Sequence, residues 1–405
     1  MVTAKTMRAI GGLVMVAALH IVGSAAHAQM KMPMHTTPGA IIPDPTQVVI
    51  IVNRDSNEIA FMDIKSRKVI AKTFLGNNVN PHMAMMSPDG RYVVTGGTRA
   101  NKAYIIETAT AKLLKSIPVG MAPEHLAFSP DGRYYYQGNP DGDSVSVIDM
   151  VSMTVIKTIT GLAEPLNITF TPDGSKAYIG NYGAHWVGVV DVKRHELLKK
   201  IHIAEVPGIT KLDPDKYLGE INGISNASIS NDGRYLYAAD GDLGIVGVID
   251  TRDDKVIKVI RVGAKPWRAY MSHDGKYAVT VNNGDETVSF IDTQTNTLAA
   301  TWPAGPEMTG VNFAAGKAFV ISPSGFLYVY TMKSLRPAGR IKVGTNIQIE
   351  TATTDTAEEK LYLANSTDHS VVIVDAKTEK LESVANVGLY PWGTHVMDSK
   401  DNYCH

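Results

Sequence analysis

The sequence predicts an all-β fold, a β-propeller of four-stranded blades, and three observations support this prediction. An alternating apolar segment that ends in Asp or an equivalent residue recurs along the chain. An Asp-Gly turn recurs ahead of aromatic-rich strands, and the C-terminal segment supplies a strand that the N-terminal repeat lacks. A repeat of roughly 40 residues is typical of propeller blades. We therefore expect one propeller domain over residues 47–399.

The alternating apolar segment is the third strand of each repeat. Its copies follow one another at spacings of 44, 42, 42, 59, 42, 39 and 44 residues, and the last two copies are the weakest. The copies are Ile59–Asp63, Ala103–Glu107, Val145–Asp149, Val187–Asp191, Val246–Asp250, Val288–Asp292, Leu327–Thr331 and Val371–Asp375. A period this regular indicates one ring of similar sheets.

The Asp-Gly turn lies between the first two strands of five repeats. It occupies residues 87–90, 129–132, 171–174, 230–233 and 272–275. Asp-Gly between two alternating runs is a strong hairpin signal, because the turn needs backbone conformations that Asp and Gly tolerate. Each repeat therefore reads as four strands, of which the last is an outer strand such as Lys112–Val119.

The two ends of the chain indicate how the ring closes. The first repeat, Val48–Phe74, has no strand before it, whereas Pro391–Met397 stands alone after the last complete repeat. Pairing these two segments would close the ring and remove open sheet edges. We therefore expect eight blades, with seven as the alternative because the last two repeats are degenerate.

The N-terminus has the features of a secretory signal peptide. Lys5 and Arg8 precede an apolar run over Ala9–Val22, and Ala26-His27-Ala28 is the small-residue pattern of a cleavage site. We expect residues 1–28 to be a signal peptide, residues 29–46 a flexible leader and residues 400–405 a C-terminal tail. The protein should therefore be periplasmic or secreted. No later segment of the sequence has the roughly 18 consecutive apolar residues that a membrane span needs.

Composition excludes several classes of function. The formal net charge of -1 lacks the basic excess of a nucleic-acid binder, so no nucleic-acid partner is expected. Cys404 is the single cysteine, which excludes an intramolecular disulfide and a covalently attached c-type haem. A small molecule, a metal ion or a periplasmic protein remains as the partner, and the oligomeric state stays open.

The repeats resemble those of the YVTN-type β-propeller family, whose units run as a Ser-Pro-Asp-Gly turn, a Tyr-Val strand and a Val-x-Val-Ile-Asp strand. The matching stretches include Ser129–Gly138 with Ser144–Asp149, and Thr171–Gly180 with Val187–Asp191. The resemblance covers roughly residues 45–398. It implies a relation to surface-layer proteins, to periplasmic binding proteins and to the eight-bladed, haem-carrying propeller of cytochrome-type nitrite reductases.

Candidate ligand-binding residues follow from aligning the first strands on the prolines that open them, at positions 81, 123, 165, 266 and 391. First strands converge at the axis of a propeller, so the residues after these prolines should form one rim of the channel. Polar and aromatic side chains on one rim are typical of a binding mouth. The candidates are Glu124, Asn167, Trp267, Arg268 and Trp392. Arg268 would suit an anionic group, or alternatively would pair with Glu124 or Glu220 across the channel.

Histidines are the candidate metal ligands. His82, His125 and His395 come from consecutive blades, and neutral imidazole suits copper, zinc or haem iron. The resemblance implies that His82 and His125 match the histidine pair that faces the haem of the nitrite reductase propeller. However, the three lie one, two and four residues after their prolines, and alternate residues of a strand point to opposite faces. The alternative is that each histidine caps its own blade.

Three further segments could contribute to a site. The leader carries Met30, Met32, Met34 and His35, which are ligands that suit copper, and His35 is an alternative axial ligand. The long spacing before Asp250 reflects an insertion near residues 204–225, which is a candidate binding loop. Cys404 and His405 could bind a metal or belong to a frayed end.

Three functions from different classes remain open. The first is an exported binding protein that holds a metal, a haem-like cofactor or a small anion at the axial mouth, with copper or a haem-type group as the candidate cofactor. The second is an oxidoreductase or cofactor-processing enzyme that uses the same mouth, although we find no phosphate loop or nucleophile-elbow motif. The third is a structural or protein-interaction propeller without a cofactor.

Overall fold

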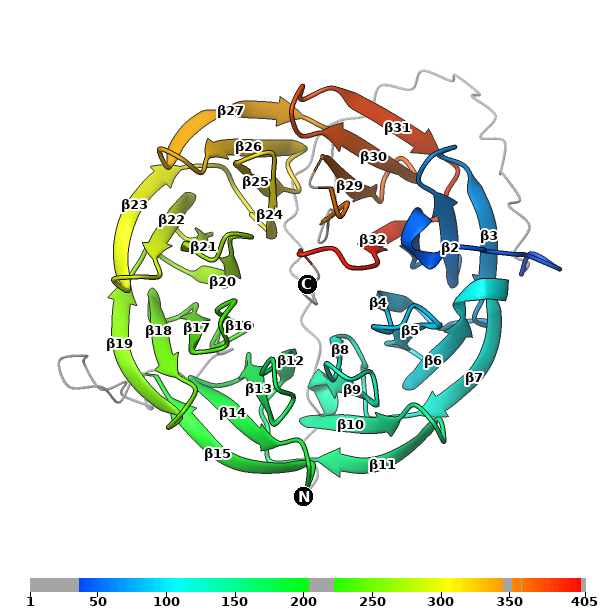
Figure 1. The fold of residues 1–405 in the computed structure, drawn as a ribbon, viewed down its shortest axis with the longest axis horizontal. Coiled ribbons are helices and arrows are strands. Elements are labelled where there is room, and N and C mark those ends of the chain that lie inside the picture. Colours follow the sequence, from blue (N-terminus) through cyan, green and yellow to red (C-terminus); the bar gives the residue numbers. More distant parts are fainter. Residues whose placement is uncertain (1–35, 204–221, 345–351, 358, 402–405) are drawn as a thin grey trace, which may run out of the picture. The chain divides into compact units, whose positions relative to one another are not determined.

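Eight sheets surround a common centre in the computed structural model, which describes residues 36–203, 222–344, 352–357 and 359–401. Each sheet has four antiparallel strands (Figure 1). Residues 34–405 form one compact unit. The prediction of an eight-bladed propeller is therefore confirmed, and the seven-bladed alternative is wrong because the two degenerate repeats form complete sheets.

The blades are numbered in chain order and their strands are given from the centre outward. Blade 1 has β32 (Pro391–Val396), β1 (Val48–Asn53), β2 (Glu58–Asp63) and β3 (Val69–Phe74). Blade 2 has β4 (Pro81–Met86), β5 (Tyr92–Gly97), β6 (Lys102–Glu107) and β7 (Lys112–Pro118). Blade 3 has β8 (Leu126–Phe128), β9 (Tyr134–Asn139), β10 (Ser144–Asp149) and β11 (Thr154–Ile159). Blade 4 has β12 (Pro165–Phe170), β13 (Lys176–Asn181), β14 (Trp186–Asp191) and β15 (Glu196–His202).

The second half of the ring repeats this order. Blade 5 has β16 (Ala227–Ile229), β17 (Tyr235–Asp240), β18 (Ile245–Asp250) and β19 (Lys255–Arg261). Blade 6 has β20 (Pro266–Met271), β21 (Tyr277–Asn282), β22 (Thr287–Asp292) and β23 (Thr297–Pro303). Blade 7 has β24 (Gly310–Ala314), β25 (Lys317–Ser322), β26 (Phe326–Thr331) and β27 (Arg336–Lys342). Blade 8 has β28 (Ala352–Thr354), β29 (Lys360–Asn365), β30 (Ser370–Asp375) and β31 (Leu381–Ala385). Three single-turn 3-10 helices are η1 (Pro45–Gln47), η2 (Thr108–Thr110) and η3 (Pro140–Gly142).

The last strand of the chain completes the first blade. β32 pairs antiparallel with β1, where Val49 faces Val396 and Ile51 faces Thr394. Both edges of β1 are thereby satisfied, one by β2 and the other by β32. The prediction that the C-terminal strand closes the ring is confirmed.

The Asp-Gly turns adopt one repeated geometry. In the turn of blade 2, Ser87 Oγ donates to Asp89 Oδ1 at 2.6 Å, and Gly90 has a φ of +71°. The equivalent glycines of blades 3 to 6 have φ values between +68° and +73°. Glycine is favoured at this left-handed position because it lacks the Cβ that would clash. These turns mark one end of the axial channel, which we call the turn end.

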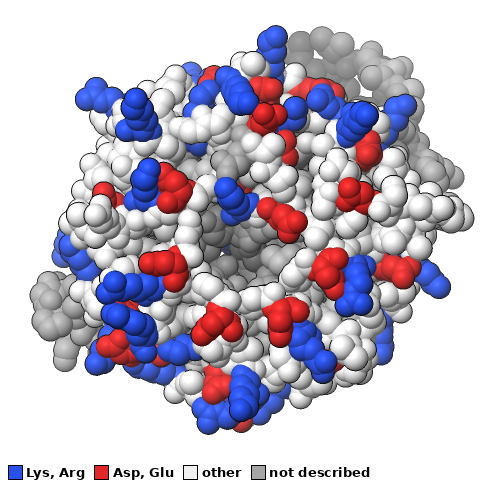
Figure 2. Space-filling model, in the orientation of Figure 1, with Lys and Arg blue, Asp and Glu red and all other residues white. Residues whose placement is uncertain are grey.

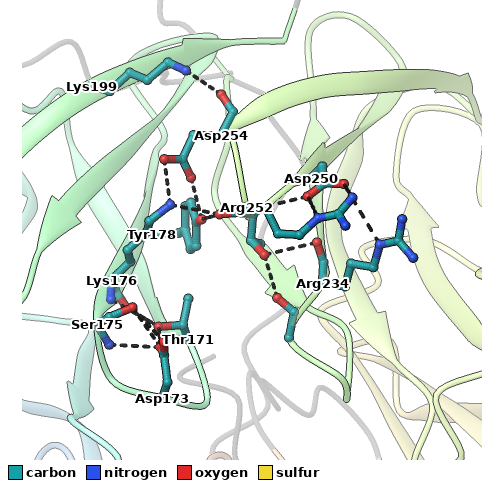
Figure 3. A network of polar contacts seen from close by, with 12 residues as sticks. Thr171, Asp173, Ser175, Lys176, Tyr178, Lys199, Arg234, Asp250, Arg252 and Asp254 are labelled. Carbon is teal, nitrogen blue, oxygen red and sulfur yellow. Dashed lines mark hydrogen bonds and ion pairs between the residues drawn. The ribbon is translucent and has the colours of Figure 1, made fainter.

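Neighbouring blades pack through apolar faces and are joined by polar contacts farther out. Figure 3 shows such a network between blades 4 and 5. Tyr178 of β13 donates to Asp254 Oδ1 at 2.7 Å, and Lys176 Nζ lies 2.8 Å from Asp254 Oδ2. Tyr136 and Tyr237 of the flanking blades contact His195 and Asn296 in the same way, at 2.7 and 2.6 Å. A tyrosine hydroxyl therefore joins each of three successive blades to the next.

Both terminal segments contact the propeller within their described parts. In the segment assigned to a flexible leader, Ile42 is 3% exposed, and Thr37 N donates to Lys72 O of β3 at 2.9 Å. In the C-terminal tail, Asp401 is 1% exposed. Its Oδ2 accepts from Asn312 Nδ2 at 3.0 Å and from Thr354 Oγ1 at 2.6 Å. Its Oδ1 lies 2.7 Å from His273 Nε2. Asp401 therefore joins the inner strands of blades 7 and 8 to the turn of blade 6.

Three segments named in the sequence analysis lie wholly or mostly outside the described residues. They are the leader up to His35, residues 204–221 of the insertion, and the end of the tail from Asn402 to His405. No helix within the described ranges is long and apolar enough to cross a membrane.

Candidate functional site

The prolines chosen from the sequence mark one end of the axial channel. Pro81, Pro165, Pro266 and Pro391 are the first residues of β4, β12, β20 and β32, and Pro123 lies three residues before β8. We call this end the proline end, because every inner strand leads from it toward the turn end. Figure 2 shows a hollow at the centre of the ring, and around it lysines, arginines and acidic residues are mixed without a patch of one sign.

His82 and His125 meet at the proline end. Their ring centroids are 6.1 Å apart, and the His82 ring lies 5.5 Å from that of Trp392. The register of β4 explains how the pair forms, because Pro81 faces Gly97 while Ala84 faces Thr95, so that two residues oppose one. Such a bulge re-aims side chains and interrupts strict alternation. The different offsets of His82 and His125 from their prolines therefore do not keep them apart.

Arg268 is a buried cation that forms no ion pair with a described residue. Its side chain is on β20, the residue is 3% exposed, and its guanidinium carbon lies 5.2 Å from the centre of the Trp267 ring. Within the described ranges, no carboxylate forms an ion pair with it, and Nε has no hydrogen-bond partner. The predicted alternative of an ion pair with Glu124 is not formed, and Glu220 lies outside the described residues. Burying a charge without a partner is unfavourable, so the position of Arg268 costs folding free energy.

A second arginine, Arg54, lies at the same end. It follows β1, and its guanidinium carbon lies 4.1 Å from the centre of the Trp392 ring and 5.7 Å from that of Tyr390. Its Nε and the buried Trp392 Nε1 both lack a hydrogen-bond partner in the part of the chain that the structure describes. At this end, three N–H donors therefore lack an acceptor among the described residues, namely Arg54 Nε, Trp392 Nε1 and Arg268 Nε.

Both arginines affect the protonation of His82. Burial, followed by the positive charges of Arg54 and of Arg268, lowers the pKa of His82 to about 3. Its imidazole is therefore neutral at pH 7.

We define the proline mouth as Arg54, His82, His125, Trp267, Arg268 and Trp392; it combines two cations, two tryptophans and two histidines. Glu124, which follows Pro123, is half-buried beside His125.

A cavity of 320 Å³ adjoins Arg268 between blades 6 and 7. Trp267, Met308 and Pro323 supply its apolar walls, and Arg268, Asn283, Glu307 and Thr309 its polar ones. Tyr182 packs edge-on against Trp267, with ring centroids 5.6 Å apart, and so supports the tryptophan from blade 4. The cavity therefore offers a partly apolar space beside a cation.

The sequence analysis missed Arg54, Tyr182, Asn283 and Pro323. All four directly follow the second strand of a blade, namely β1, β13, β21 and β25. Second strands run back toward the proline end, so their following residues meet the residues after the prolines. Aligning the ends of the second strands as well as the starts of the first would have found them.

The structure places His395 and Asn167 on a second cavity. Both line a cavity of 370 Å³ at the turn end of the channel. Asn167 Oδ1 accepts from Thr169 Oγ1 at 2.9 Å and joins blade 4 to Ala227 N of blade 5 at 3.4 Å. Burial lowers the pKa of His395 to about 4. Over the described ranges, no three His, Cys, Asp or Glu side chains gather as they would around a metal. His82 and His125 are therefore brought together without His395.

A family model described as YNCE-like beta-propeller matches residues 20–204, less than half of the 405 residues. No curated protein matches the chain. The propeller assignment is supported, whereas the YVTN-type assignment stays a prediction.

Solved structures of similar fold share little sequence with the chain. "Dihydro-heme d1 dehydrogenase NirN in complex with DHE" matches with a TM-score of 0.71 and 15% identity, covering 87% of this chain and 76% of that chain. "Hydrazine Synthase" of Kuenenia stuttgartiensis matches with a TM-score of 0.56 and 20% identity, covering 75% and 97%. A functionally unknown protein from Desulfotomaculum acetoxidans DSM 771 matches with a TM-score of 0.59 and 14% identity, covering 89% and 99%. At these identities the likeness concerns the fold, and the chain is an eight-bladed β-propeller.

Proposed function

We propose that the chain is an exported, periplasmic binding protein whose proline mouth holds an anionic, carboxylate-bearing ligand. The observation that carries this proposal is Arg268, a 3% exposed guanidinium with no ion pair to a described residue, beside a 320 Å³ cavity. A buried cation without a partner destabilises the ligand-free protein. A ligand carboxylate would replace the missing counter-charge through bidentate, charge-assisted hydrogen bonds.

The rest of the proline mouth narrows the class of ligand. Arg54 supplies a second cation, and Trp267 and Trp392 supply aromatic surface for an apolar or flat body. Polar groups placed around a partly apolar cavity are typical of small-molecule sites. The ligand is therefore expected to carry acidic groups on a partly apolar framework.

A haem-type tetrapyrrole fits this description and is the leading candidate. It combines a flat apolar ring with carboxylates, and the neutral imidazole of His82 is in the protonation state that binds iron. Arg54 and Arg268 would hold its carboxylates, and His82 or His125 would lie toward the metal. The solved structure of NirN, described as a complex with DHE, is a precedent for a propeller of this fold with such a ligand. When bound, the group would supply redox chemistry, and the protein would supply position and charge.

Binding titrations test the proposal. The purified protein is titrated with ferric haem, followed by its visible spectrum, and separately with citrate and phosphate by calorimetry. Loss of one charge-assisted contact of about 1.5–3 kcal/mol weakens binding by roughly 10- to 150-fold, so Arg268→Met and Arg54→Met should each do so. The matched control is Arg252→Met, because Arg252 pairs with Asp250 at 2.6 Å on the outside of blade 5.

Three results distinguish the possibilities. Haem binding that depends on both arginines supports the tetrapyrrole, and binding of citrate or phosphate alone supports a small anion. Equal affinity of every variant for all three probes contradicts the proposal and leaves the propeller as a protein-interaction module. Export is tested separately by the N-terminal residue of protein from the periplasmic fraction, which should be Gln29.

A further inference from the structure

The 370 Å³ cavity at the turn end is not used by the proposed function. Its walls come from blades 1 to 5 and are largely apolar, with Leu126, Phe128, Ile168 and Phe170 among them. Met85, Met86, Met397 and His395 line the same cavity. Three thioethers and one imidazole around a mostly apolar space are an unusual grouping, since packing alone requires neither sulfur nor a polar ring.

His395 is a buried side chain that lines the same cavity. It is 7% exposed. Its neighbours on β32 show where it points, because Thr394 Oγ1 donates to Tyr362 O of blade 8 at 2.8 Å and Val396 packs in the cluster with Tyr362. Alternate residues of a strand face opposite sides, so His395 faces blade 2. β4, the inner strand of blade 2, lies beside β32 in Figure 1.

The methionines of the cavity lie on that side. Met86 is the last residue of β4, is 4% exposed and packs in the core cluster between blades 1 and 2, which Met397 also contacts. The Met397 sulfur lies against the turn that starts one residue after Met86, because a Cβ placed on Gly90 would meet Met397 Sδ at 2.9 Å. Met85 instead packs toward blade 3. His395, Met86 and Met397 therefore share the region between β32 and β4.

We infer that this cavity binds a cuprous ion through the imidazole of His395 and the thioethers of Met86 and Met397. Thioether and imidazole ligands suit soft Cu(I), whereas Mg²⁺ and Ca²⁺ require oxygen ligands and structural Zn²⁺ takes thiolate, imidazole or carboxylate. Neutral ligands also suit a singly charged ion in an apolar cavity. Asp398 is the one carboxylate among the lining residues, and it is exposed at the rim.

Anaerobic titration with Cu(I) against a chromophoric Cu(I) chelator tests the inference. One equivalent should bind, and X-ray absorption should show one nitrogen and two sulfur neighbours. Replacing groups that only support a ligand already costs roughly 10- to 100-fold in metal affinity, so loss of a ligand should cost at least about tenfold. The variants are His395→Gln, Met86→Leu and Met397→Leu. Met271→Leu is the matched control, because Met271 ends β20 as Met86 ends β4 and is 3% exposed.

The leader is the competing source of thioethers and is tested in the full chain. A variant with leucine at positions 30, 32 and 34 and glutamine at 35 should keep the cavity equivalent. The inference is overturned if that variant loses all Cu(I) binding, or if Met86→Leu and Met397→Leu both bind as tightly as the unaltered protein. Thermal unfolding of each variant shows whether it is folded, and the two leucine variants retain the test if His395→Gln does not fold.

Discussion

Replacing Arg268 should stabilise the ligand-free protein and weaken its binding of the anionic ligand. Arg268→Met keeps a long, unbranched side chain against Trp267 but removes a charge that is 3% exposed and has no described counter-ion. Residues kept for function at the expense of stability are expected at binding sites. If Arg268 served only to stabilise the fold, its replacement would lower the free energy of unfolding.

The magnitude follows from two opposing contributions. Replacing buried charges by apolar groups of similar volume is often stabilising by about 1–4 kcal/mol. Loss of the cation–π contact with Trp267 costs about 1 kcal/mol. The two contributions leave a net gain of between about 0 and 3 kcal/mol. With an unfolding entropy near 2.1 cal/mol/K per residue over roughly 350 residues, each kcal/mol corresponds to about 1.4 °C, so Tm should rise by up to about 4 °C.

Calorimetry and urea unfolding of the ligand-free protein measure this change. Arg252→Met is again the control, since it removes an exposed arginine that is paired with Asp250 and should change stability by less than about 1 kcal/mol. A loss of stability of 1 kcal/mol or more in Arg268→Met would refute the reasoning, because it would mean that the guanidinium is satisfied in the ligand-free state.

Two other predictions concern the histidines and the contacts between blades. Burial holds the folded-state pKa of His82 at about 3 and that of His395 at about 4, below the unfolded value near 6.5. The contribution of these histidines to the free energy of unfolding should therefore be fully present above pH 6.5 and fall as pH drops toward 4, by up to about 1.4 kcal/mol per pH unit for each histidine. Urea unfolding at a series of pH values measures this fall, which should be less steep with pH in His395→Gln. Tyr178→Phe removes a hydroxyl that donates to the Asp254 carboxylate at 2.7 Å and should cost about 1.5–3 kcal/mol of unfolding free energy. Tyr237→Phe, whose acceptor is the neutral Asn296, should cost about 1 kcal/mol; equal losses in the two variants would show that charge adds nothing.

The fold could be predicted from the sequence because local signals and the repeat agreed. The Asp-Gly turns need a positive φ at glycine, which Gly90 and its four equivalents adopt. The unpaired first repeat required the strand at Pro391–Val396, which pairs with β1. Both features depend on neighbours in sequence or on counting strands, so no knowledge of side-chain contacts was needed.

The site could be predicted only in part, because strand register was treated as strict alternation. The bulge after Pro81 lets His82 reach His125, whereas His395 faces the Met86 side of the channel. Arg54 was missed because it follows a second strand, and only the three-dimensional course of that strand brings it to Trp392. The roles of Asp401 likewise depend on where the tail packs after the ring has closed.

Blade 1 joins strands that lie far apart in the sequence, since β1 starts at Val48 and β32 ends at Val396. During synthesis, one row of backbone N–H and C=O groups of β1 therefore has no strand partner until residues 391–396 have been made. A prematurely terminated product keeps that row exposed for good, which makes it a template for aberrant pairing. A chaperone or protease that binds an unpaired strand edge would therefore recognise chains in which β32 has not yet paired with β1, whatever the state of the other seven blades.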